Sequence, residues 1–224
     1  MTKPFLFLSD FDGTLSNKDF FHVIIDKYHK ENAVKLYEDW DKKVMTDLAY
    51  LSSIFQSIGH DQATIDADIR SIPFDPNAKK VIEHVQRLGG DFVVISAGTD
   101  YYIKKIFADY GIDNVAIYSN PGTYHEGGIK LTVDPAGRYY SEMYGINKQK
   151  VAEDLMKDYQ TVFFAGDSRP DLEAACLADT IFAKGKLQGL LAERKQTFVP
   201  IADFADVDRF LTDHEEVFTD ASSR

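Results

Sequence analysis

Short, continuous runs of apolar residues recur along this chain. Five of them lack the alternation of apolar and polar positions that marks a half-exposed sheet, and such runs are typical of strands buried on both faces. They are residues 5–8, 92–95, 115–118, 162–165 and 181–183. Between them lie patterns typical of helices, at residues 78–88, 101–110 and 148–159. Strands that alternate with helices predict an α/β fold, with a doubly wound parallel sheet and helices on both faces.

Residues 18–71 break this alternation. They contain two helical patterns, residues 20–28 and 48–58, but no run typical of a strand. Turn-forming residues flank the segment on both sides, as expected for linkers that act as a hinge. We therefore predict a small α-helical cap inserted into the core. The predicted boundaries are residues 16–75 for the cap, and residues 1–15 and 76–224 for the α/β catalytic core.

A second irregular stretch covers residues 120–145. Its Pro-Gly and Gly-Gly pairs are turn signals, and residues 129–133 between them are mostly β-formers. This stretch predicts a β-hairpin or flap instead of a helix.

Charge and composition exclude several classes of protein. The formal net charge is −11 and no cluster of Lys and Arg is present, which argues against a nucleic-acid partner. The single cysteine, Cys176, excludes an intramolecular disulfide and a Cys-rich zinc site. No stretch approaches the roughly 20 apolar residues of a membrane span, and no signal-peptide pattern is present. We expect a cytoplasmic protein, and a monomer and a homodimer both stay open.

Two carboxylates, Asp10 and Asp12, follow the first apolar run directly. Side chains two residues apart in an extended segment point to the same side, so both can face one ligand while Gly13 lets the chain turn away. Ligands of parallel sheets bind at the carboxyl ends of strands. An isolated Asp-x-Asp is usually a solvated turn, but behind a buried strand it predicts a shared cation or a shared proton.

Groups suited to a phosphate follow at two other places. Ser96 and Ala97 come directly after the second run, where a hydroxyl and backbone N–H groups can approach phosphate oxygens. Lys148 begins a helical pattern, and its long cationic side chain can reach an oxyanion. Without this context Lys148 would be read as a surface lysine, and Lys150 competes with it.

Asp167 and Asp171 follow the fourth run. Two carboxylates at a strand end suit a hard cation that prefers oxygen ligands, although Asp171 also fits a simple helix start after Pro170. A carboxylate brought to about 4 Å from a phosphate costs about 4 kcal/mol per pair of unit charges at an effective dielectric near 20. Both Mg²⁺ and a lysine are therefore expected beside the phosphate.

These motifs, in this order, resemble those of the haloacid dehalogenase-like phosphohydrolase superfamily. The resemblance implies a Rossmann-like core and a Mg²⁺-dependent phosphatase that forms a covalent aspartyl-phosphate. It implies that Asp10 is the nucleophile and that Asp12 is first the acid and then the base. The other implied roles are phosphate binding by Ser96, Ala97 and Lys148, and Mg²⁺ binding by the carboxylates of Asp10 and Asp167 and the backbone carbonyl of Asp12, with Asp171 in or behind the ligand set.

Within this superfamily, the position of the cap resembles the phosphoserine phosphatase group. The motifs are similar to those of methionine-salvage phosphatases that act on 2-hydroxy-3-keto-5-methylthiopentenyl-1-phosphate. Asp19 stands at the cap-entry position and is expected to contact the substrate, unless it is only a residue of the first helical turn. Residues 51–54 lack an Arg to pair with a serine carboxylate, which argues against phosphoserine. Phe20, Phe21 and Tyr28 are expected in the core of the cap.

The predicted function is hydrolysis of a small phosphorylated metabolite by a Mg²⁺-dependent phosphatase. Three alternatives stay open at this point. One is a phosphatase of phosphoserine or of another phosphomonoester, and another is a mutase that returns the phosphoryl group to a carbon skeleton. The third is a protein that binds a phosphometabolite without turnover.

Overall fold

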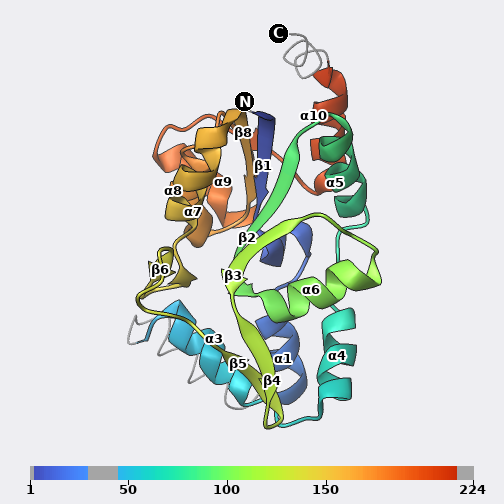
Figure 1. Ribbon diagram of the computed structural model, residues 1–224, viewed down its shortest axis with the longest axis vertical. Helices are drawn as coiled ribbons and strands as arrows, with labels where there is room; N and C mark the ends of the chain where they lie inside the picture. The colour runs from blue at the N-terminus through green and yellow to red at the C-terminus, as the bar shows by residue number, and fades with distance from the viewer. Residues whose placement is uncertain (1–2, 30–44, 216–224) are drawn as a thin grey trace.

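A computed structural model describes residues 3–29 and 45–215 of the 224-residue chain. Its centre is a six-stranded sheet in which every pair of neighbouring strands is parallel (Figure 1). All five predicted strands are present in it. Across the sheet the order is β10 (Val199–Pro200), β9 (Thr180–Ala183), β8 (Tyr159–Gly166), β1 (Lys3–Ser9), β2 (Asp91–Thr99) and β3 (Ala116–Asn120).

Helices cover both faces of the sheet, as the unbroken apolar runs require. Along β1, Phe5 and Phe7 belong to the hydrophobic cluster of one face, whereas Leu6 and Leu8 belong to that of the other. The ring of Phe7 stacks on that of Phe92 with centroids 5.0 Å apart, so aromatic packing continues from β1 to β2. The predicted doubly wound α/β fold is confirmed. The first face packs against α5 (Ala78–Arg87), α6 (Asp100–Asp109) and α10 (Phe204–Asp213), and the second against α7 (Lys148–Leu155), α8 (Leu172–Ala175) and α9 (Gly185–Glu193).

The strand order reverses beside β1. The chain runs from β1 to β2 and β3 on one side, and then returns to place β8 on the other side of β1. In open parallel sheets, ligands bind at such a reversal, outside the carboxyl ends of the strands. The carboxyl ends of β1, β2 and β8 therefore define the edge where a site is expected.

Helices of the predicted cap lie beyond this edge, at the lower end of Figure 1. Among the described residues they are α1 (Phe20–Tyr28), α3 (Asp47–Gln56) and α4 (Gln62–Arg70). The chain enters and leaves this region through two segments that pair with each other, because Ser16 bridges Phe74 and the Asn17 N–H donates to the Pro73 carbonyl at 2.8 Å. Residues 30–44 of the predicted cap lie outside the described residues. The cap boundaries and the hinge motion stay predictions.

The hairpin predicted within residues 120–145 is present. Strands β4 (Gly122–His125) and β5 (Gly128–Leu131) are antiparallel and are joined by Glu126 and Gly127, both with positive φ. The hairpin contacts the cap region, since the His60 N–H donates to the Gly127 carbonyl at 3.0 Å. A second short pair, β6 (Tyr140–Ser141) and β7 (Gly145–Ile146), follows it.

The predicted helix over residues 148–159 is too long. Helix α7 ends at Leu155 and is followed by a 3₁₀ turn, η2 (Met156–Asp158). Tyr159 already belongs to β8, where it pairs with Lys3 of β1. Sheet pairing, which the helical pattern does not encode, therefore ends the helix one turn early.

Candidate active site

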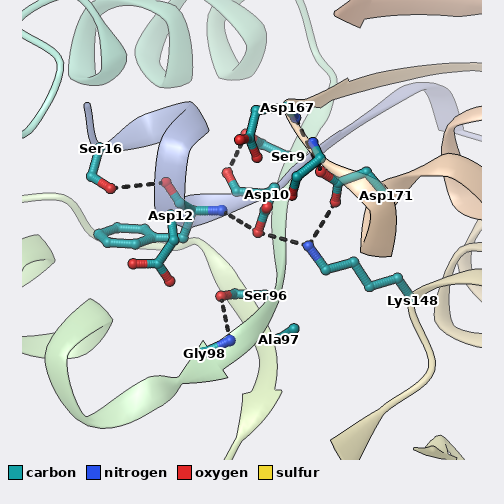
Figure 2. Close-up of polar contacts among 12 residues, drawn as sticks. Ser9, Asp10, Asp12, Ser16, Ser96, Ala97, Gly98, Lys148, Asp167 and Asp171 are labelled. Atoms are coloured by element: carbon teal, nitrogen blue, oxygen red, sulfur yellow. Dashed lines mark hydrogen bonds and ion pairs between the residues drawn. The ribbon is translucent and has the colours of Figure 1, made fainter. Parts of the chain in front are cut away.

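Asp10 lies one residue beyond β1, at the carboxyl end of the strand (Figure 2). Its backbone N–H donates to the Ala165 carbonyl of β8 at 2.9 Å, so the sheet pairing continues through this residue. The side chain is 7% exposed. Its Oδ1 accepts the Phe11 N–H at 2.7 Å and lies 2.7 Å from the Nζ of Lys148. The carboxylate is thus held between the strand end and a buried lysine.

Asp12 lies in the next turn, η1 (Phe11–Leu15), with an extended backbone. Its Oδ1 accepts the backbone N–H of Phe20, the first residue of α1, at 3.2 Å. Its Oδ2 accepts a hydrogen bond from the hydroxyl of Tyr102 on α6. Asp10 and Asp12 line one cavity, as predicted, but their carboxylates have different partners.

Gly13 permits the close approach of Asp167 to this turn. Its φ is +74°, and a Cβ added there would lie 2.6 Å from the Oδ2 of Asp167. A side chain at this position would therefore be strained in its backbone and would also push Asp167 away. The glycine that follows the Asp-x-Asp pair is required for the carboxylates to meet.

Three carboxylates gather at the strand ends. Oxygen atoms of Asp10, Asp167 and Asp171 lie within 4.8 Å of one another. Asp167 follows β8, and Asp171 ends the short turn η3 (Arg169–Asp171). The predicted Mg²⁺ contact of Asp12 concerned its backbone carbonyl and stays a prediction.

Within this cluster, both carboxylate oxygens of Asp171 already have polar partners. Its Oδ2 accepts the backbone N–H groups of Asp167 at 3.0 Å and Ser168 at 3.1 Å, and its Oδ1 lies 2.7 Å from the Nζ of Lys148. By contrast, the Oδ1 of Asp167 is buried and has no hydrogen-bond partner among the described residues. Asp171 therefore holds the loop and the lysine in place, while Asp167 keeps one oxygen free of such contacts. A helix-start role alone does not explain Asp171.

Lys148, and not the exposed Lys150, reaches the site. Asn147 caps the helix that carries it by accepting the Lys150 N–H at 3.0 Å. The Lys148 side chain is 2% exposed and bridges Asp10 and Asp171 at 2.7 Å each. Burial alone would lower the pKa of Lys148, but these two carboxylates raise it above its ordinary value. The ammonium group therefore stays charged.

The positive charge of Lys148 is smaller than the total negative charge of the ionised carboxylates around it. Burial, and then the Asp171 carboxylate, raises the pKa of Asp10 well above its ordinary value and that of Asp167 to about 6. A hard divalent cation prefers clustered oxygen ligands with an excess of negative charge. The carboxylates of this site offer both. The residues present therefore fit Mg²⁺.

Ser96 and Ala97 occupy the end of β2 beside this cluster (Figure 2). The Oγ of Ser96 is buried and accepts the Gly98 N–H at 3.0 Å. Asn120 holds the next peptide by donating to the Ala97 carbonyl at 2.8 Å. Helix α6 begins two residues after Gly98 and has Thr99 as its N-cap. The structure thus brings Ser96, Ala97 and Lys148 to the same cavity.

The site opens into a cavity of about 470 Å³ between the strand ends and the cap helices. Asp19 lines it, although it is also the N-cap residue of α1. Its side chain makes no capping hydrogen bond, so the simple helix-start interpretation does not account for it. Burial, and then the Asp167 carboxylate, raises the pKa of Asp19 to about 6. The cap residues on the cavity wall are Asp19, Phe21, His22, Asp47, Tyr50, Leu51 and Phe55.

The sequence-based prediction was wrong for one cap aromatic. Phe20 is fully buried, as predicted, but Phe21 is half-buried and lines the cavity. Helical periodicity places the two residues on different faces and does not say which face meets the strand ends. The motifs did not predict a role for Tyr102, because an aromatic residue in an amphipathic helix usually belongs to the core. Its position within one turn of Gly98 was the available signal.

Comparison with known proteins identifies the family of this chain. The model of a family described as haloacid dehalogenase-like hydrolase matches residues 7–175. The chain belongs to this family. It is 26% identical over 215 residues to a 2-hydroxy-3-keto-5-methylthiopentenyl-1-phosphate phosphatase from Bacillus pumilus, with 90% of each chain covered.

Solved structures of similar fold include two phosphoserine phosphatases. One is a substrate-bound complex, with a TM-score of 0.66, 18% identity, and coverage of 94% of this chain and 99% of that chain. The other is described as a phospho-aspartyl intermediate analogue, with a TM-score of 0.66, 19% identity, and coverage of 93% and 99%. The prediction of a haloacid dehalogenase-like phosphoric monoester hydrolase is confirmed.

Proposed function

We propose that this hydrolase uses Mg²⁺ and a covalent aspartyl-phosphate formed on Asp10 to release phosphate from a small metabolite. The observation that carries the proposal is the buried Asp10 carboxylate, held 2.7 Å from Lys148 at the edge of a cavity that Asp167 shares. A carboxylate that is fixed beside a cation is suited to nucleophilic attack on a phosphate ester. Mg²⁺, held by Asp10, Asp167 and the Asp12 carbonyl, would offset negative charge on the phosphoryl group.

The two steps follow from the residues present. An Asp10 oxygen bonds to phosphorus while the bond to the ester oxygen breaks, and Asp12 gives that oxygen a proton. Asp12, now ionised, takes a proton from a water molecule, whose oxygen bonds to phosphorus while the bond from phosphorus to the Asp10 oxygen breaks, which releases inorganic phosphate and restores the Asp10 carboxylate. Ser96, the Ala97 backbone and Lys148 hold the phosphoryl oxygens throughout.

We propose 2-hydroxy-3-keto-5-methylthiopentenyl-1-phosphate, the substrate named for the Bacillus pumilus relative, as the substrate. The described cap residues on the cavity wall include four apolar or aromatic side chains but no Lys or Arg, whereas Arg169 and Lys186 line the cavity from the core. A cap of this kind suits an uncharged tail better than the carboxylate of phosphoserine, because a buried anion needs a cationic partner. Phosphoserine and other phosphomonoesters are the alternative substrates.

We further propose a cytoplasmic enzyme whose partner is this metabolite and which binds no nucleic acid. Within the described residues, 3–29 and 45–215, no helix is long and apolar enough to cross a membrane. The net charge of −11 is unfavourable for contact with a phosphate backbone.

A panel of phosphorylated metabolites tests the proposed function. Purified protein with Mg²⁺ is expected to hydrolyse the methylthiopentenyl substrate with a kcat/KM at least about tenfold above that for phosphoserine, since a missing charge partner costs more than 1.4 kcal/mol. Phosphate release is measured for each compound, with p-nitrophenyl phosphate as a generic ester. A higher kcat/KM for phosphoserine would favour the alternative substrate, and binding without any phosphate release would favour a non-catalytic protein.

The pH profile tests the role of Asp12 as an acid. Burial, and then the Asp19 carboxylate, raises the pKa of Asp12 to about 7. An acid acts only while protonated, so we expect kcat/KM for an alkyl phosphate to fall as the pH rises through about 7. Asp19→Asn removes one of the two causes and should move this fall to lower pH. An unchanged profile in Asp19→Asn would argue against Asp12 as the group that titrates.

A further inference from the structure

Tyr102 is the one hydroxyl donor that the structure shows on the Asp12 carboxylate among the described residues. It stands in the first turn of α6 and is 1% exposed. Its hydroxyl donates to the Oδ2 of Asp12, while the Oδ1 of Asp12 accepts the backbone N–H of Phe20. Each oxygen of the acid is therefore held by a group outside its own turn, one from the core helix α6 and one from the cap helix α1.

The ring of Tyr102 packs against two of the cap helices, α1 and α3. Its centroid lies 5.2 Å from that of Phe20 on α1 and 6.3 Å from that of Phe55 on α3. The ring of Phe11, beside Asp12, lies 5.8 Å away. These rings leave the buried phenol little room to move, so the packing of α1 and α3 helps to hold its hydroxyl against Asp12.

Gly98 gives independent evidence for this contact. A Cβ added at Gly98 would overlap the Tyr102 hydroxyl and would lie 2.6 Å from the Oδ2 of Asp12. The φ of Gly98 is not in the left-handed region, so the backbone conformation does not require glycine. The space that glycine leaves is filled by the hydrogen-bonded pair of Tyr102 and Asp12.

We propose that Tyr102 is a positioning residue that holds Asp12 against the leaving-group oxygen and links this alignment to the packing of the cap. The inference rests on the proposed function, because it assumes that Asp12 protonates the leaving group. Removal of the hydroxyl leaves the acid with one of its two anchors. Proton transfer depends steeply on such alignment.

Two esters of similar shape separate this role from a general structural one. Nitrophenolate leaves p-nitrophenyl phosphate readily without a proton, whereas the alkoxide of benzyl phosphate needs one. In Tyr102→Phe, with Mg²⁺ present, we expect kcat/KM for benzyl phosphate to fall on the order of 10- to 100-fold. For p-nitrophenyl phosphate we expect a fall of less than about threefold, since general-acid help is small there. The measured quantity is the ratio of the two kcat/KM values.

Tyr159→Phe is the matched control. Tyr159 also donates its hydroxyl to a carboxylate, that of Asp91, but at the start of β8 and far along the sheet from the site. Its ratio should equal that of the wild type. If Tyr102→Phe does not fold, as judged by its thermal transition, Gly98→Ala displaces the same pair from the other side and should shift the ratio in the same direction.

If folded Tyr102→Phe has the wild-type ratio of the two kcat/KM values, or loses equally for both esters, the inference is overturned. The proposed function still stands in that case, provided that the wild type turns over its substrates. A wild-type protein that releases phosphate from neither ester nor from any compound of the metabolite panel would overturn both. The two failures are therefore distinguishable.

Discussion

Asp10→Asn is expected to abolish phosphate release while leaving the fold intact. The substitution removes the nucleophilic oxygen that lies beside Lys148 but keeps the size and shape of the side chain. Loss of a nucleophile lowers turnover by at least about 10³-fold. Phosphate release with Mg²⁺ from the best substrate of the panel measures the effect.

The stability of this variant should not fall. Burial and the neighbouring Asp171 make the charged form of Asp10 unfavourable in the folded protein, so the neutral amide relieves repulsion. Lys148 keeps its second partner, Asp171, at 2.7 Å. We expect a thermal midpoint equal to or above that of the wild type. Loss of activity together with a lower midpoint would indicate unfolding instead of a lost nucleophile.

Asp113→Asn serves as the matched control, because Asp113 is exposed and lies outside the cavity. Full activity is expected in this variant. Acid-quenched wild-type protein should also carry a hydroxylamine-sensitive phosphoryl group on the peptide that contains Asp10. Substantial turnover in Asp10→Asn would remove the assignment of Asp10 as the nucleophile.

Chelation of Mg²⁺ is the second change with a large expected effect. A cation that offsets charge on the phosphoryl group contributes several kcal/mol, so EDTA should lower kcat by at least about 10²-fold. Added Mg²⁺ should restore it. Activity that survives exhaustive chelation would contradict the proposed cofactor.

Removal of Mg²⁺ should also change the pH dependence of stability. The pKa is raised from 3.8 to about 7 for Asp12 and to about 6 for Asp167. Between pH values of about 4 and about 7, the folded state binds more protons than the unfolded state. The metal-free protein therefore loses stability as the pH rises through this range. Mg²⁺ competes with protons for the Asp167 carboxylate, and its charge also favours the ionised form of Asp12. Its stabilising effect should therefore be larger at pH 8 than at pH 5.

Thermal unfolding with Mg²⁺ and with EDTA measures this difference. At about 100 times its Kd, a bound ion adds about 2.7 kcal/mol, which is about 5–10 °C for a chain of this size. Asp167→Asn removes the negative charge of the carboxylate whose Oδ1 has no hydrogen-bond partner among the described residues, and should abolish the shift. An equal shift in Asp167→Asn would place the ion elsewhere.

Much of this site could be read from local sequence. An unbroken apolar run such as residues 5–8 can only be buried on both faces, and it ends at Asp10 whatever the rest of the chain does. Parallel strands align their carboxyl ends, so Asp10, Ser96 and Asp167 were bound to meet at one edge. Short β10 was missed because two residues, one of them proline, carry no periodic signal.

The contacts of the cap could be predicted less well from the sequence. A helical pattern shows that residues 20–28 have an apolar face but not what that face meets, so Phe21 was placed in the cap core although it lines the cavity. The hairpin was predicted from its turns, but its contact with His60 depends on how β4 and β5 pack beside α3.

By itself, the sequence determined the buried strands, the order of the motifs along the chain, and the carboxylates and lysine of those motifs. These features follow from local periodicity and from residue type. Only the tertiary structure decided which atom each group engages. It paired Lys148 with Asp10 and Asp171, left an oxygen of Asp167 without a partner, and placed the Tyr102 hydroxyl on Asp12. Such contacts join residues far apart in the chain, and their geometry depends on the packing of whole elements, which no local pattern encodes.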